Sequence, residues 1–383
     1  MTTIDDLVPS PPDWRLDWDA IDGTLDCIRA LKGCPQDPLY HAEGDVWLHT
    51  RMVVECLVAS EHWRAFTADD RCLAFAGTLL HDVGKPARTT IENGRITSRG
   101  HSLTGEGMAR VLLWRMGVPA ARREQIAALV AHHQVPLNFL DRDDPLRIAA
   151  RISLRTRNDL LAVVAEADAR GRICRDQDKL IEQVALFRAF CDEAHCLDRA
   201  FAFPSDHSRF MYFRRPARSP HYAAHDDSLF EVVVMSGLPA VGKDAWIRQH
   251  LPDLPVVSLD DIRDDLDISA ADSQGPVIVE AKERARRYLR AGTPFVWNAT
   301  NLARATRRHW IDLFTDYEAR IRIVHVEAPE PVLRARNRER TNPVPEAVID
   351  RMLTRWQVPD LTEAPRVDWV GGKGTMVGGC EIP

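Results

Sequence analysis

The sequence lacks an apolar run long enough to cross a membrane, and its first stretch, MTTIDDLVPSPPDW, is acidic and proline-rich instead of apolar. A membrane-spanning helix and a secretory signal peptide are therefore not expected. The sequence also lacks an excess of basic residues, because 50 Lys and Arg are opposed by 56 Asp and Glu, a formal net charge of −6. Any surface that binds an anionic polymer must therefore be a local one.

Cysteine provides neither a disulfide framework nor a clear metal site. The eight cysteines are scattered among segments with helical periodicity, and only Cys191 and Cys196 lie close together, in CDEAHC. Their spacing does not match that of a zinc site. The pattern is typical of reduced thiols, so we expect a cytoplasmic protein with no membrane attachment.

At 383 residues the chain is long enough for two domains, each with its own hydrophobic core. Helical periodicity dominates residues 1–200 and predicts an all-α domain. The segment 201–228, dense in Pro, Ser, Tyr and Arg, breaks all periodicity and predicts a connector. Its FMYFRR stretch mixes aromatics with arginines, as single-strand-binding surfaces do, although a packing hinge explains it equally well. Residues 229–383 predict an α/β domain with a parallel sheet, ending in a mobile glycine-rich tail.

The clearest motif follows the β-branched run EVVVMS, residues 231–236, which predicts a strand buried on both faces. A glycine loop from Gly237 to Gly242 comes next, then Lys243, and AWIRQHL predicts the helix that follows. Strand, glycine loop, Gly-Lys and helix in this order are the context of a phosphate-binding P-loop. Backbone N–H groups and the helix N-terminus would bind phosphate oxygens, and Lys243 would add a positive charge.

One position departs from the usual P-loop pattern. The residue after the lysine is commonly Ser or Thr and binds magnesium, but here it is Asp244. A carboxylate suits a hard cation, directly or through water, yet it adds negative charge beside a triphosphate. The motif therefore predicts Mg²⁺ with ATP or another NTP, with Asp244 as a candidate for the nucleotide site.

A second strand is predicted over residues 255–259, and Asp260, Asp261 and Arg263 follow at its carboxyl end. In an open α/β sheet this edge is where ligands bind. A carboxylate at this position could accept the proton of an attacking hydroxyl group, as a kinase requires. The alternative is that Asp260 only caps a helix that starts at Ile262.

At this point the sequence resembles a family. GLPAVGKDAW, SLDDIR, the later NATN and the segment LRARNRER…NPVPEAVIDRM are similar to the 5′-hydroxyl polynucleotide kinase domains of bacterial and phage end-healing enzymes. The resemblance implies that Asp260 is the general base and that Arg263 engages a phosphate of the acceptor strand. It also implies a lid whose arginines contact nucleotide phosphates, for which we favour Arg336 and Arg340 without excluding Arg338.

The arginines of this lid are closely spaced. On a helix, Arg334 would pair with Arg338 and Arg336 with Arg340, and four cations so close repel one another unless anions lie among them. Bound phosphates would supply these anions.

In the N-terminal half, polar residues lie on apolar helical faces. His49 shares a face with Met52 and Val53, and Asp168 shares one with Leu161 and Val164. A single inward histidine is most often a satisfied core residue. However, an apolar helix ends in the adjacent pair His81 and Asp82, and such groups are costly to bury unless something satisfies them. One shared metal ion explains all of these positions together.

The pattern His, His-Asp, Asp resembles the HD phosphohydrolase superfamily. HAEGDVWLHTRMV with LLHDVGKP is also similar to the HD domain attached to bacterial tRNA nucleotidyltransferases. The resemblance implies a phosphoesterase in which a first metal, Mg²⁺ or a transition metal, is bound by four ligands: His49, His81, Asp82 and Asp168. Three further histidines are candidates for a second metal or for substrate phosphate: His101, His132 and His133. A core role for His133 is the alternative.

Lys85 follows the His-Asp pair by three residues, beyond a helix stop formed by Gly84 and Pro86. It could reach a phosphoryl oxygen and is a candidate catalytic residue. An exposed lysine without a function would give the same pattern.

Together the two halves resemble bacterial fusions of an HD domain with a polynucleotide kinase. The resemblance implies an end-healing enzyme of RNA repair that removes a 2′,3′-cyclic or 2′-phosphate and phosphorylates a 5′-hydroxyl end of RNA or DNA. An RNA ligase is then a candidate partner. Two alternatives stay open. One is a kinase of a nucleoside or metabolite with a separate HD nucleotidase, and the other is a regulatory NTP-binding switch with a structural HD domain.

Overall fold

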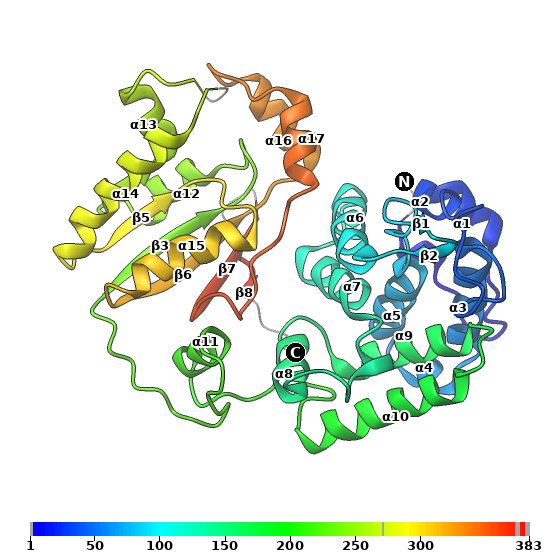
Figure 1. Ribbon diagram of the computed structural model, residues 1–383. Coiled ribbons are helices and arrows are strands. Elements are labelled where there is room, and N and C mark those ends of the chain that lie inside the picture. The colour runs from blue at the N-terminus through cyan, green and yellow to red at the C-terminus, as the bar shows by residue number, and fades with distance from the viewer. Residues whose placement is uncertain (1–2, 270–271, 372–375, 380–383) are drawn as a thin grey trace. The chain divides into compact units, whose positions relative to one another are not determined.

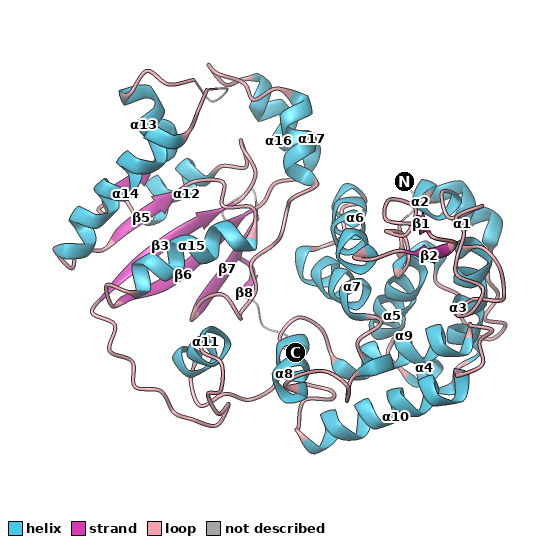
Figure 2. Cartoon of the chain, in the orientation of Figure 1, coloured by secondary structure: helices cyan, strands magenta, loops and turns pink. Residues whose placement is uncertain are grey.

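The computed structural model describes residues 3–269, 272–371 and 376–379. The chain forms two compact units, one up to Ala202 and one from Phe203 onward. The first is helical and the second is an α/β unit (Figures 1 and 2), which confirms the predicted fold class. Among the described residues, no helix is both long and apolar enough to cross a membrane.

The helical unit contains one short hairpin and a series of helices. In chain order its elements are η1 (Asp5–Leu7), α1 (Trp18–Thr24), α2 (Asp26–Arg29), α3 (Val46–Ala59), α4 (Glu61–Ala65), α5 (Ala68–Leu80), β1 (Thr90–Glu92), β2 (Arg95–Thr97), α6 (His101–Arg115), α7 (Ala120–His132), η2 (Pro136–Asn138), α8 (Pro145–Ser153), α9 (Asn158–Arg170) and α10 (Gln177–Glu193).

The centre of this unit is formed by α3, α5, α7 and α9. Helix α5 packs against α3, α7 and α9, and every residue from Cys72 to Leu80 is buried. Helix α9 is buried almost all round as well, as expected for helices without a solvent-facing stripe. Because α5 ends inside the unit, the residues that follow it, His81 and Asp82, are buried too.

The second unit contains a six-stranded sheet in the order β4-β5-β3-β6-β7-β8. All neighbouring pairs are parallel except β7 and β8, which are antiparallel. Helix α14 packs against β4 and α15 against β6. The strands and helices are α11 (Asp206–Arg214), β3 (Phe230–Ser236), α12 (Lys243–His250), β4 (Val256–Ser258), α13 (Leu259–Asp265), α14 (Gly275–Arg290), β5 (Phe295–Asn298), α15 (Arg304–Thr315), β6 (Ala319–Val326), α16 (Glu330–Arg338), α17 (Glu346–Leu353), β7 (Arg366–Val370) and β8 (Met376–Gly379).

Two sequence expectations need correction. The segment 201–228 is not without regular structure, because it contains α11, in which Phe210 and Tyr212 are buried. Arg209 of this helix donates hydrogen bonds to the carbonyl oxygens of Leu361 and Pro365, so α11 packs within the second unit. In the tail that was expected to be mobile, residues 376–379 form β8, and residues 372–375 and 380–383 lie outside the described residues.

Gly171, directly after α9, provides a test of the packing between α9 and α3. A Cβ atom there would lie 2.5 Å from Val53 Cγ2 and 2.7 Å from its backbone N and Cα. Gly171→Ala should therefore lower the free energy of unfolding by about 1–3 kcal/mol. Gly107 inside α6 has open space around it, so Gly107→Ala should raise that free energy by about 0.5–1 kcal/mol. Amide hydrogen exchange in α3, α6 and α9 measures both effects, and equal protection in the two variants would contradict the prediction.

Candidate functional site

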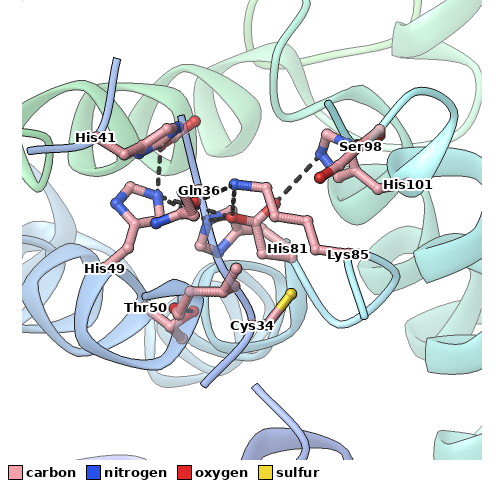
Figure 3. Close-up of polar contacts among 12 residues, drawn as sticks. Cys34, Gln36, His41, His49, Thr50, His81, Lys85, Ser98 and His101 are labelled. Carbon is pink, nitrogen blue, oxygen red and sulfur yellow. Dashed lines mark hydrogen bonds and ion pairs between the residues drawn. The ribbon is translucent and has the colours of Figure 1, made fainter. Parts of the chain in front are cut away.

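The carboxylate of Asp82 lies at the centre of a buried polar cluster at the end of α5. Figure 3 labels four of its neighbours: His49, His81, Lys85 and His101. Its Oδ2 atom lies 2.7 Å from Lys85 Nζ, 3.1 Å from His81 Nε2 and 3.7 Å from His49 Nε2. His49 Nε2 in turn lies 3.2 Å from Oδ1 of Asp168, which α9 contributes. The structure therefore brings together the four predicted ligands of a first metal.

The other oxygen of the same carboxylate faces two more histidines. Asp82 Oδ1 lies 3.2 Å from His101 Nε2 and 3.8 Å from His133 Nε2. His101 begins α6 and His133 directly follows α7. His132 does not join the cluster, because it is half-buried and its Nε2 lies 3.2 Å from Nη1 of Arg155. Asp82 thus lies between two groups of nitrogen ligands.

Four imidazole rings face Asp82, those of His49, His81, His101 and His133. Each has a contact at its Nδ1 atom that fixes its orientation. Backbone oxygens at 2.7–2.8 Å are the hydrogen-bond partners of three rings: Thr78 O for His81, Ser98 O for His101 and Val130 O for His133. The Nδ1 atom of His49 lies 2.8 Å from Glu43 Oε1. An Nδ1–H that donates to such an oxygen leaves Nε2 as the basic nitrogen. All four Nε2 atoms face Asp82, so the rings have the direction that a metal site requires.

The electrostatics of the cluster also suit a cation. Desolvation would raise the pKa of Asp82, but the charges of His81 and Lys85 hold it well below its usual range. Burial lowers the pKa of His133 to about 3, so this ring is neutral and able to bind metal. Neither oxygen of Asp82 accepts a hydrogen bond of good geometry from the described residues. A buried carboxylate in this state, surrounded by nitrogen and oxygen donors, fits a divalent metal ion.

Two residues near the cluster were missed at the sequence level. Glu43 accepts a hydrogen bond from the backbone N–H of Ile173, and its Oε1 lies 2.8 Å from Nδ1 of both His41 and His49. Arg172 donates to both oxygens of Asp168 at 2.9 and 2.5 Å. Both residues support a ligand instead of facing Asp82. An acid between two histidines, as in HAEGDVWLH, is the signal that could have revealed Glu43.

In the second unit, the loop after β3 has the backbone of a phosphate cradle. Gly237 has φ +143°, and a Cβ atom there would lie 2.4 Å from Val326 O. Gly242 has φ +107° and immediately precedes α12. Lys243 Nζ donates to the carbonyl oxygens of Gly237 and Leu238 at 3.1 and 2.9 Å. Desolvation lowers the pKa of this ammonium to about 8, so it lacks an anionic partner strong enough to offset its burial.

Two other predicted residues lie at the edges of this loop. Asp244 is exposed, and its Oδ1 accepts a hydrogen bond from Asn298 Nδ2 at 2.7 Å, which ties the start of α12 to the end of β5. Arg336 of α16 donates to Val241 O at 3.1 Å. A side chain at Gly242 would approach the same guanidinium to 3.4 Å. The structure therefore places Arg336 directly over the glycine loop.

Asp260 lies in the first turn of α13 at the carboxyl end of β4. The N-cap of this helix is Ser258, not Asp260, so the capping alternative is wrong. Asp260 is paired with Arg263, and its Oδ2 lies 3.7 Å from Arg340 Nη2. Its side chain is 64% exposed, so an incoming hydroxyl group could reach it. Asp260, Arg263 and Arg340 thus lie together beside the phosphate loop.

The expectation that all four lid arginines need bound phosphates to offset their mutual repulsion holds only in part. Arg334 does not depend on phosphate for an anionic partner, because it pairs with three carboxylates: Glu330, Glu346 and Asp350. This residue joins α16 to α17. Arg336 and Arg340, which face the phosphate loop and Asp260, are the better candidates for binding nucleotide.

Comparison with known proteins assigns a domain type to each half. Residues 46–180 match the family model described as HD domain, and residues 232–359 match the one described as AAA domain. The curated relatives include multifunctional CCA proteins of Laribacter hongkongensis, 32% identical over 45% of this chain and 41% of the relative, and of Ralstonia nicotianae, 32% identical over 42% and 37%. The chain thus spans about two fifths of these relatives.

Two solved structures are similar to part of the chain. A putative kinase from Chloroflexus aurantiacus has 16% identity and a TM-score of 0.32, and covers 38% of this chain and 86% of its own. A sugar kinase from Janibacter sp. has 16% identity and a TM-score of 0.30, with the same coverage.

The lowered pKa of Lys243 predicts how nucleotide binding depends on pH. The ammonium is the form that attracts phosphate, and a bound polyphosphate would raise its pKa above the value of about 8 in the free protein. Affinity should therefore be constant below this pKa and fall by up to about tenfold per pH unit above it, with proton uptake on binding. Calorimetric titration between pH 7 and 10, in buffers of different ionisation enthalpy, measures both quantities. Lys243→Arg should remove the proton uptake, and a pH-independent wild-type affinity would contradict the prediction.

Proposed function

We propose that this protein repairs broken nucleic-acid ends, with a metal-dependent phosphoesterase in the helical unit and a 5′-hydroxyl kinase in the α/β unit. The observation that carries the first half is the convergence of four Nε2 atoms and Lys85 on the buried carboxylate of Asp82. A structural metal site would use all ligand positions for protein atoms, whereas a hydrolytic site keeps one for water. Lys85 and His101, the more accessible members, are suited to meet a phosphate.

In the phosphoesterase, each residue of the cluster has a separate task. A divalent metal held there would supply an activated water molecule. Water would add to phosphorus as one P–O bond breaks and the leaving oxygen takes up a proton. For a 2′,3′-cyclic end this opens the ring, and a second hydrolysis of the resulting phosphomonoester would release inorganic phosphate. His49, His81, Asp82 and Asp168 would hold the metal, and His101 and His133, near the other oxygen of Asp82, would hold a second metal or meet the substrate phosphate. Lys85 would offset the negative charge that develops on the phosphoryl oxygens. A 2′,3′-cyclic or 2′-phosphate at an RNA end is the substrate that we propose.

In the kinase, Asp260 would accept the proton of the 5′-hydroxyl group as its oxygen attacks the γ-phosphorus. The nucleoside diphosphate would then leave. The negative charge on the transferred phosphoryl group would be stabilised by Lys243, Mg²⁺, Arg336 and Arg340. Arg263 would bind a phosphate of the acceptor strand. The exposure of Asp260 supports a large acceptor, since a small metabolite would need a more enclosed position. The likeness to multifunctional CCA proteins supports a nucleic-acid substrate.

The decisive experiment gives the full chain two substrates. One is an oligonucleotide with a 5′-hydroxyl end and γ-labelled NTP, and the other is an RNA with a 2′,3′-cyclic phosphate end and a divalent metal. We expect label transfer to the first and phosphate release from the second. Transfer only to nucleosides or small metabolites would identify a small-molecule kinase, and NTP binding without either reaction would identify a regulatory switch.

Kinase variants test the roles in the α/β unit. Lys243→Ala or Asp260→Ala should lower phosphoryl transfer by at least about 10²-fold, because each removes charge stabilisation or the general base. Release of phosphate by the helical unit should stay unchanged, because each unit has its own core. Both activities are measured on each variant. Loss of both in a folded variant would show that one coupled site performs both reactions.

Metal-ligand variants test the helical unit. His81→Ala or Asp82→Asn should abolish phosphate release and leave the kinase active, because each removes a ligand from the centre of the cluster. Chelation of the wild type should stop phosphate release, and added divalent metal should restore it. If chelation instead unfolds the helical unit, and the metal-loaded protein hydrolyses no phosphoester, the site is structural.

A further inference from the structure

The ammonium of Lys85, the candidate phosphate contact, lies against Gln36 as well as Asp82. The proposed chemistry does not use Gln36. Lys85 Nζ lies 2.6 Å from Gln36 Oε1 and 2.7 Å from Asp82 Oδ2, as Figure 3 shows for the labelled pair Gln36 and Lys85. The lysine side chain is 7% exposed. Gln36 lies 49 residues earlier in the chain, in the loop before α3. No motif in the neighbouring sequence predicts a role for it.

Both partners of this contact are fixed. Gln36 Nε2 donates to Gly44 O at 3.4 Å, which turns the amide oxygen toward Lys85. The backbone of Lys85 is held by its N–H, which donates to Asp82 O at 2.9 Å. The adjacent Gly84 packs against α6 so closely that a Cβ atom would lie 2.2 Å from His101 O. The main chain from which the Lys85 side chain extends is therefore fixed.

A metal ion at the cluster changes the balance between the two acceptors. The ion would compete with Lys85 for the charge of Asp82 and would repel the ammonium. A buried ammonium without a carboxylate partner needs other acceptors. Gln36 is a neutral acceptor whose Oε1 lies 2.6 Å from the ammonium, so it can keep this contact when a metal ion draws on the charge of Asp82.

We propose that Gln36 is a positioning residue. It keeps the Lys85 ammonium beside Asp82 when a bound metal ion offsets the negative charge of that carboxylate. An ammonium has three N–H donors, so Gln36 leaves the others for the phosphoryl oxygens of a substrate. This inference rests on the proposed metal-dependent function. It explains why an uncharged amide, and not a second carboxylate, lies on this lysine: a carboxylate would neutralise the charge that the phosphate needs.

The test is a double-mutant cycle between Gln36 and Lys85 in the full chain. Manganese affinity, from competition with a chelator, and inorganic phosphate affinity of the manganese-loaded protein are measured on each variant. Gln36→Met keeps the shape and removes the acceptor, so Lys85 depends on Asp82 alone. Both affinities should fall by about tenfold, the lower end of the range for residues that support metal sites. Lys85→Met removes the competitor, so manganese should bind at least as tightly as in the wild type while phosphate binds more weakly.

The cycle separates positioning from a structural role. In the Lys85→Met background, Gln36→Met should change neither affinity. If it has the same effect there as in the wild type, Gln36 only supports the loop through Gly44, and the inference is wrong. Gln36→Glu provides a second test, since its carboxylate should strengthen manganese binding and weaken phosphate binding. Loss of both affinities in Gln36→Glu would also overturn the inference.

A matched control is Gln183→Met, on α10, which should leave both affinities unchanged. The two proposals fail in different ways. If the wild type binds no divalent metal, the proposed function of the helical unit is wrong. If the wild type binds manganese and phosphate but Gln36→Met behaves like the control, only the role of Gln36 is wrong.

Discussion

The helical unit is organised around one costly feature, a carboxylate buried at the end of an apolar helix. Asp82 is 1% exposed, and a charged group there must be compensated by its surroundings. The compensation comes from histidines that lie on or directly follow four helices, α3, α5, α6 and α7. Three of these rings, those of His81, His101 and His133, are anchored by a backbone oxygen. The Nδ1 anchors are local, three residues back in the chain for His81, His101 and His133. The contacts of the rings with Asp82 and Asp168 join α3, α5, α6, α7 and α9, so the packing of these helices and the geometry of the cluster depend on each other.

The phosphate loop of the second unit depends on a comparable support beneath it. Asn301 donates to Met235 O at 2.7 Å, and its own carbonyl accepts from Arg307 at 2.9 Å. Arg307 is fully buried and forms a double hydrogen bond with Glu363. This arginine has a structural role, because all three of its nitrogen atoms donate to oxygens of the same unit. The end of β3, and hence the glycine loop, is held by residues from three later segments of the chain.

Much of this architecture is predictable because local patterns and ligand chemistry agree. The strand before the glycine loop, the helix that ends at His81 and the inward face of Asp168 follow from periodicity and burial. The parts that the sequence does not reveal are those set by tertiary contact. Gln36 contacts Lys85 across 49 residues, and Arg334 pairs with acids on a different helix. Neither pairing produces a periodic pattern in the sequence from which it could be predicted. Helix α11 was missed because Pro, Ser and Arg surround a short apolar face that is buried only by packing.

The two lysines that we propose as phosphate contacts, Lys243 and Lys85, differ in how the protein stabilises their charge. Lys243 is held only by backbone carbonyl oxygens, which are neutral, so its charge is weakly supported and its pKa falls to about 8. Lys85 is held by one carboxylate and one amide. An anionic substrate stabilises the first directly. In the function that we propose, Lys85 would contact a substrate once a metal ion offsets the charge of Asp82. The kinase site would therefore bind phosphate with its lysine alone, whereas the phosphoesterase site would depend on its metal for both the attacking water and the release of its lysine.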